Sequence, residues 1–257
     1  MKLALATLWI LVGGAITGGL YWAFLITPVS TILALITSAL LAIAVLAVLG
    51  TVVNGAIDIL ARGFSLAGLR RAFASSTAVI PAGLVVLALW AVTNKAEVSV
   101  AQYGGQINAW FIARFGWDDV SWFFTAIRYL AVWLRWVIGG LLAVSLMTAV
   151  LTGGWRALAS ASWVGRAIRP RAVAVATLAF VTLIELPWIY LVPWRPESLP
   201  ATAVEMVFIV AKLSLAAILA AVGSALLISE ASSLAPSAAH VPPSGASEPQ
   251  TNASLQP

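Results

Sequence analysis

The 257-residue chain contains no cysteine and a single histidine. The absence of cysteine excludes disulfide bonds, thiolate metal ligands and cysteine nucleophiles, and it leaves the redox compartment of the protein open. The histidine, His240, lies in a Ser- and Pro-rich stretch where no preorganised acid–base site or metal cluster is expected. The Walker, Rossmann and nucleophile-elbow patterns are also absent. We therefore expect a protein without a catalytic site, a bound metal or a cofactor.

Charged residues are also scarce. They make up 9% of the chain, against about 25% in soluble domains, while hydrophobic residues make up 62%. Apolar runs longer than about 18 residues recur, which favours membrane-spanning segments over the core helices of a soluble protein. The alternating segments of a membrane β-barrel are absent, so helices are the expected spanning structure. The sequence therefore predicts an all-α, polytopic helical membrane protein.

Six apolar segments are predicted to cross the membrane and to form one six-span bundle over residues 1–230. They cover about residues 3–26, 29–57, 78–93, 121–152, 171–192 and 201–228. The first run continues well beyond the hydrophobic core of about 7–15 residues in a signal peptide, so we expect an uncleaved span, with cleavage as the alternative. Residues 231–257, rich in Ser, Ala and Pro, are predicted to form a disordered cytoplasmic tail.

Lysine and arginine near the ends of these spans are distributed unevenly between the two sides. One side has only Lys95, Arg114 and Arg195, and the other has Lys2, Arg62, Arg70, Arg71, Arg156, Arg166, Arg169 and Arg171. The positive-inside rule then places both termini in the cytoplasm. The Ala/Leu/Gly bias and the compact loops favour a bacterial cytoplasmic membrane. Because the basic residues flank apolar spans, the net charge of +5 indicates contact with the lipid bilayer and argues against nucleic-acid binding.

Two polar segments between spans predict short amphipathic helices on the membrane surface. In residues 58–77, one side of a helix carries Leu66, Leu69 and Phe73. Residues 105–117 place Ile107, Trp110, Phe111 and Phe115 on one face in the same way, with a re-entrant segment as the alternative.

Smaller local features have structural interpretations. Asp58 and Arg62 are four residues apart, so they are expected to form a helical ion pair that contributes about 0.3–0.5 kcal/mol if exposed. Asp118 and Asp119 are expected to cap the fourth span. Close packing of the first span against a neighbour is expected from its small residues, which are Gly13, Gly14, Gly18 and Gly19.

Five ionisable residues fall within the predicted spans, and they are Arg128, Arg135, Glu185, Glu205 and Lys212. The two arginines are seven residues apart, as are the last two residues, so each pair occupies one face of its helix. An unpaired charge at the centre of a spanning helix costs about 2.5–3.5 kcal/mol. Arg135, Glu185 and Lys212 are predicted to lie at similar depths, so Glu185 is expected to pair with both of the others. Arg128 and Glu205 are predicted to lie nearer the headgroups.

Two interpretations of this charge cluster remain open. It either forms a structural ion-pair network between spans four, five and six, or lines a polar cavity for a small anionic ligand or an anionic lipid, since the five charges sum to +1. The second interpretation predicts a transport or ligand-binding protein. The first fits a structural or assembly subunit of a membrane complex, whose partner is another membrane protein or a second copy of the chain.

Overall fold

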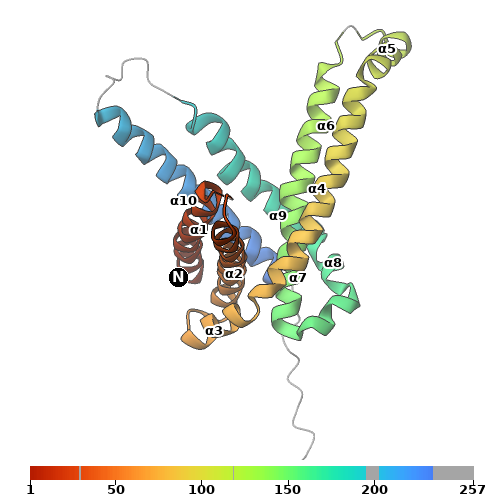
Figure 1. Ribbon diagram of the computed structural model, residues 1–257. Coiled ribbons are helices and arrows are strands. Elements are labelled where there is room, and N and C mark those ends of the chain that lie inside the picture. Colours follow the sequence, from red (N-terminus) through yellow and green to blue (C-terminus); the bar gives the residue numbers. More distant parts are fainter. Residues whose placement is uncertain (29, 118, 195–202, 234–257) are drawn as a thin grey trace, which may run out of the picture.

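The computed structural model describes residues 1–28, 30–117, 119–194 and 203–233. Within these ranges every regular element is helical and no strand is present (Figure 1). Asp118, Arg195 and His240 lie outside the described residues, as does residue 234 onward of the tail predicted for residues 231–257, whereas residues 231–233 belong to the last helix. The fold class is therefore all-helical, as the sequence predicts.

The helical elements follow one another with short connections. In chain order they are α1 (Lys2–Ile26), α2 (Ile32–Arg62), α3 (Leu66–Ala74), η1 (Ser76–Ala78), α4 (Val79–Gln102), α5 (Gly104–Phe115), α6 (Ser121–Trp133), η2 (Leu134–Ile138), α7 (Gly139–Gly153), η3 (Trp155–Ser160), α8 (Ser162–Ala167), α9 (Pro170–Phe180), η4 (Val181–Glu185), η5 (Pro187–Leu191) and α10 (Ala203–Ser233). The elements η2, η4 and η5 are π-helical turns that continue the helices before them.

Six helical stretches are long and apolar enough to cross a membrane, in agreement with the sequence-based prediction. They are Lys2–Ile26, Ile32–Arg62, Ser76–Gln102, Ser121–Gly153, Pro170–Leu191 and Val204–Ser232. The third differs most from its predicted bounds, because α4 continues to Gln102 and not to residue 93. The additional residues include Lys, Glu, Gln and Ala, which favour a helix, and Glu97 finds an ion-pair partner within the fold.

The centre of the fold is α7, which contacts α2, α4, α8, α9 and α10. Most of its residues are buried, including the large side chains Leu141, Leu146 and Met147. Neighbouring helices present alanines to the same core, among them Ala82 and Ala176. These small side chains allow the helices to approach α7 closely.

Two arms diverge from α7 (Figure 1). One arm consists of α4 together with α6 and η2, and it has α5 at its far end; the other consists of α9 and α10. An aromatic cluster packs α5 against the start of α6, through Trp110, Phe111, Phe115, Trp117, Trp122 and Phe123. The amphipathic helix predicted for residues 105–117 is therefore present as α5, which has no buried residue.

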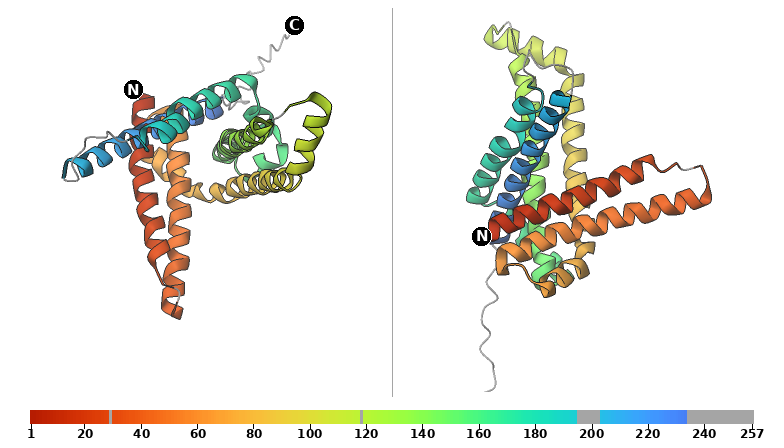
Figure 2. Two further views of the ribbon diagram at one scale, coloured as in Figure 1. Left: turned by 90° about the horizontal axis from the view of Figure 1, so that it is seen from above. Right: turned by 90° about the vertical axis from the view of Figure 1, so that its left-hand side faces the viewer.

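The antiparallel hairpin of α1 and α2 runs across the direction of the other long helices (Figure 2). Most of its buried residues lie toward one end, at Ala6 and Gly13 in α1 and at residues 50–59 in α2. Of the glycines expected to pack closely, Gly13 contacts Val52, whereas the other three have no neighbour within 4 Å of an added Cβ. The six long helices therefore do not form a single bundle of parallel helices, because the hairpin crosses the direction of the others.

Candidate ligand-binding cavity

Arg135, the charged residue deepest in the fourth predicted span, is paired with α4. Its Nη2 donates to the carboxylate of Glu97, and its Nε donates to Thr93 Oγ1 at 2.7 Å. The guanidinium also lies 5.9 Å from the centroid of the Trp90 ring. The Arg135 and Glu97 side chains are only 17% and 24% exposed, so this ion pair is largely sheltered from solvent.

The predicted pairing of Arg135 with Glu185 is therefore wrong. The extra length of α4 brings Glu97 to the level of Arg135 on the neighbouring helix, so the guanidinium is already neutralised. Glu97 was not among the expected partners because it lies beyond residue 93, where the third span was predicted to end. Its spacing of four from Thr93 was the available signal, since that spacing puts both residues on one helical face.

Lys212 also has partners other than Glu185. Its Nζ donates to the backbone oxygens of Val192 at 2.6 Å and Trp194 at 3.0 Å, and lies 5.4 Å from the ring centroid of Phe208. These carbonyls lie at and just after the C-terminal end of η5. The last carbonyl oxygens of a helix have no hydrogen-bond donor within that helix, so a nearby cation is favourable there. Lys212 therefore joins the two helices of one arm by capping the end of the first.

The two remaining charges of the predicted cluster lie on different helices, α6 and α10. Arg128 is exposed on α6 and forms no ion pair among the described residues. Glu205 lies in the first turn of α10, where a carboxylate interacts favourably with the helix dipole. The structure thus does not bring Arg135, Glu185 and Lys212 together in one ion-pair network.

Glu185 instead faces a cavity of about 670 Å³ between the fourth, fifth and sixth candidate spans. The walls consist of Val132, Trp136, Gly140, Val144, Phe180, Ile184, Glu185, Trp188, Ile189, Ala220, Ser224, Leu227 and Ile228. Among these lining residues Glu185 is the only ionisable one, and Ser224 supplies the only hydroxyl. The structure gives Glu185 no hydrogen bond or ion pair within the described part of the chain. The cavity is therefore a partly open, mainly apolar site with one carboxyl group that has no ion-pair partner among the described residues.

Three π-helical turns, η2, η4 and η5, surround this cavity. They supply Trp136, Glu185 and Trp188 to its lining. In η5, Pro187 has no N–H to donate, and the Val192 N–H bonds to the Pro187 oxygen at 3.1 Å, five residues back. The helix is thus locally widened into a π turn at Pro187–Leu191. Such turns are rare and often occur at functional sites.

Small side chains on α7 and α10 leave the space beside the π turns unfilled. Gly140 on α7 and Ala220 and Ser224 on α10 line the cavity without filling it. Beside the cavity, the Trp133 indole N–H donates to Thr177 Oγ1 at 2.9 Å and holds α6 against α9. The cavity lies between the three spans that were expected to hold the charge cluster, and of that cluster only Glu185 lines it.

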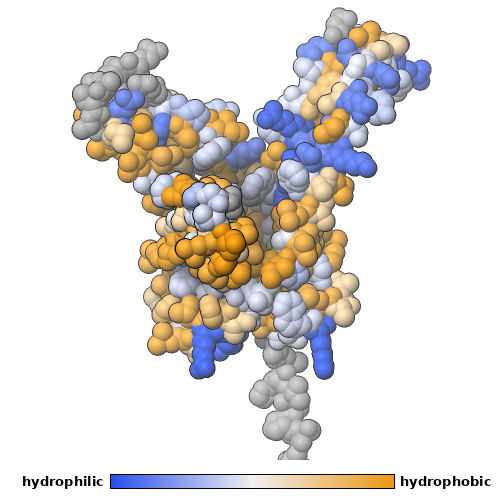
Figure 3. Space-filling model, in the orientation of Figure 1, coloured by the Kyte–Doolittle hydropathy of each residue, from blue (hydrophilic) through white to orange (hydrophobic). Residues whose placement is uncertain are grey.

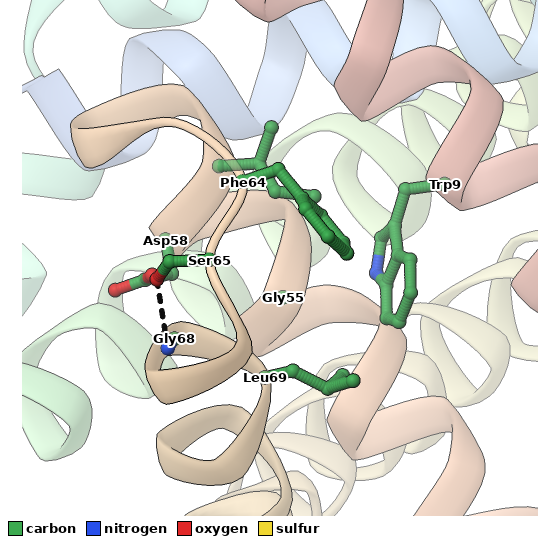
Figure 4. A pocket seen from close by; sticks show the side chains of 8 residues that line it. Trp9, Gly55, Asp58, Phe64, Ser65, Gly68 and Leu69 are labelled. Carbon is green, nitrogen blue, oxygen red and sulfur yellow. Dashed lines mark hydrogen bonds between the residues drawn. The ribbon is translucent and has the colours of Figure 1, made fainter.

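A second, much smaller pocket lies between α1, α2 and α3 (Figure 4). Its volume of about 10 Å³ admits little more than one water molecule. Asp58 is buried there and pairs with Arg62 Nε at 3.1 Å, as predicted, and also with Arg71 Nη2 at 3.2 Å. The added Cβ of any other residue at Gly68 would meet Asp58 Oδ2 at 2.1 Å. This cluster therefore has a structural role, which is to attach α3 to the end of α2.

The described residues contain no group of three or more histidine, cysteine, aspartate or glutamate residues that could hold a metal ion. Comparison of the chain with protein-family models, with curated proteins and with solved structures gives no match.

Proposed function

We propose that the chain is an integral membrane protein that binds an amphipathic molecule in the cavity between its fourth, fifth and sixth spans, for transport or for lipid handling. The surface supports the membrane setting. Large hydrophobic side chains are exposed along the long helices, for example Leu33 at 75% and Val207 at 69%. Figure 3 shows hydrophobic residues over the middle of the visible face, with hydrophilic residues mainly on the upper right arm and at the lower edge.

The cavity itself is the observation that carries the proposed binding function. Its volume of about 670 Å³ lies within the range of about 300–1,000 Å³ that is usual for small-molecule sites. Its walls combine apolar and aromatic side chains with two polar groups, Glu185 and Ser224, which is the usual composition of such sites. A site built only for helix packing would be filled by side chains.

A filled-cavity variant tests this function. The substitutions Gly140→Phe and Ala220→Phe, made together, place two benzyl groups in the cavity. Binding of the neutral fluorescent probe N-phenyl-1-naphthylamine to the purified protein in a neutral detergent should be lost. The matched control carries Gly14→Phe and Gly83→Phe, at two glycines with open space around an added Cβ, and should bind the probe normally. Equal binding by both variants, with unchanged thermal unfolding, would refute the proposed site.

The proposed setting is a bacterial cytoplasmic membrane with both termini in the cytoplasm. The basic residues of α3, α8 and the adjoining turns support this orientation. Because the chain has no cysteine, single cysteines report the topology directly. A cysteine at Gly105 should react with an impermeant maleimide in intact cells, whereas one at Ser65 should react only after permeabilisation. The reverse pattern would contradict the orientation.

An assembly role is the second candidate, and the α1–α2 hairpin favours it. Its outer part exposes apolar side chains such as Ile32 at 80% and Leu33 at 75%. Lipid or another membrane protein would cover this surface. Native mass spectrometry from a mild detergent distinguishes the two functions: a complex that persists after the hairpin is shortened at its tip contradicts the assembly role of the hairpin.

A further inference from the structure

The charged residues that line the cavity indicate whether its ligand is a cation or an anion. Among the described residues Glu185 is the only ionisable one in the lining, and no described lysine or arginine forms an ion pair with it. The two basic residues expected beside it are occupied elsewhere, Arg135 by Glu97 and Lys212 by backbone oxygens. An anionic ligand would place a like charge beside the Glu185 carboxylate among apolar side chains, where repulsion is less screened than in water.

Two tryptophans add a second feature that favours a cation. Trp136 and Trp188 line the same cavity as Glu185 and are 65% and 67% exposed, so their ring surfaces are available to a ligand. Indole faces attract cations, and the attraction strengthens where water is excluded. An acidic group with aromatic rings around it is the usual arrangement for recognising ammonium groups.

We infer that the ligand of this cavity is a lipophilic cation, an apolar body with an amine or quaternary ammonium group that pairs with Glu185 between Trp136 and Trp188. This inference rests on the proposed binding function and specifies the chemical class of its ligand. The remaining lining residues, such as Phe180, Ile184 and Leu227, provide contact for the apolar body. The anionic ligand expected from the sequence depended on placing Arg135 and Lys212 in the site, and neither lines it.

Tetraphenylphosphonium and tetraphenylborate provide a direct test, because they have nearly the same size and shape but opposite charge. Equilibrium dialysis against the purified full-length protein in a neutral detergent measures both affinities. The phosphonium should bind at least about tenfold more tightly than the borate. In Glu185→Gln this preference should fall by about tenfold or more, while binding of the neutral probe stays unchanged. Glu230→Gln removes a carboxylate outside the cavity and should keep the preference.

The outcomes separate the inference from the function on which it rests. Equal affinities for the two ions, or a preference that persists in Glu185→Gln, would overturn the inferred cation while the neutral probe still binds. Absence of binding by both ions and by the neutral probe would overturn the proposed function itself. A Trp136→Leu and Trp188→Leu variant that loses only the phosphonium preference would support the aromatic contribution.

Discussion

Substitution of Glu97 by Gln should destabilise the fold, because it leaves the Arg135 guanidinium without a counter-charge. Exposed ion pairs contribute about 0–1 kcal/mol, whereas removal of one partner from a buried pair costs about 3–5 kcal/mol. With side chains 17% and 24% exposed, this pair lies nearer the buried limit. The hydrogen bond to Thr93 at 2.7 Å remains and recovers part of the loss.

We therefore expect a loss of about 2–3 kcal/mol, which is about 30- to 150-fold in the unfolding equilibrium. This value is close to the cost of about 2.5–3.5 kcal/mol for an uncompensated arginine at the centre of a spanning helix. Reversible unfolding of the purified protein in mixed micelles, followed by tryptophan fluorescence, measures it.

Two further variants sharpen the comparison. The double variant Arg135→Leu/Glu97→Leu should be nearly as stable as the wild type, since replacing both charges leaves neither unpaired. Glu185→Gln should leave stability nearly unchanged, because that carboxylate has no partner in the described structure. A stable Glu97→Gln together with an unstable Glu185→Gln would refute the pairing described here and restore the one expected from the sequence.

Two other predictions concern local geometry. Gly50→Ala should lower the free energy of unfolding by about 1–3 kcal/mol, since the new Cβ would lie 2.2 Å from the Ser76 oxygen. Gly14→Ala has open space around the new Cβ, so in the same unfolding assay it should leave the free energy of unfolding unchanged or raise it. At Asp119, hydrogen bonds from the backbone N–H and then the hydroxyl of Ser121 lower the carboxyl pKa below 3.8. Its contribution to stability is thus present above pH 3.8 and lost as pH falls through the lowered pKa. Asp119→Asn should therefore flatten the acid limb of the stability–pH curve, and an unchanged curve would exclude this contribution.

The positions of the long helices could be predicted from the sequence because long apolar runs have few alternatives to helices of that length. The same holds for α3 and α5, whose apolar residues recur at helical spacing. The Asp58–Arg62 pair also followed from spacing alone, since residues four apart are neighbours on any helix.

The partners of Arg135 and Lys212 could not be predicted in this way. Depth estimates compare residues along the membrane normal, but they carry no information about which face of a helix meets which neighbour. Glu97 and Glu185 are both within reach of the fourth candidate span by depth, and only the packing of α4 beside η2 selects Glu97. The π turns also rotate the residues that follow them relative to a regular α-helix. The α-helical spacing of the sequence therefore does not predict that Trp136 and Trp188 line the same cavity.

The α1–α2 hairpin is held at one end only. Both of its helices contact α10, and α2 also contacts α4 and α7, while nearly all of its buried residues lie toward that one end. At 25 residues, α1 is about 38 Å long, against a hydrocarbon core of about 30 Å. In the proposed bilayer the hairpin would therefore tilt about its packed end, and the thickness of the membrane would set the angle of that tilt. A thinner bilayer would increase this tilt and move the hairpin relative to α10. The helix α10 contacts the hairpin and also lines the cavity.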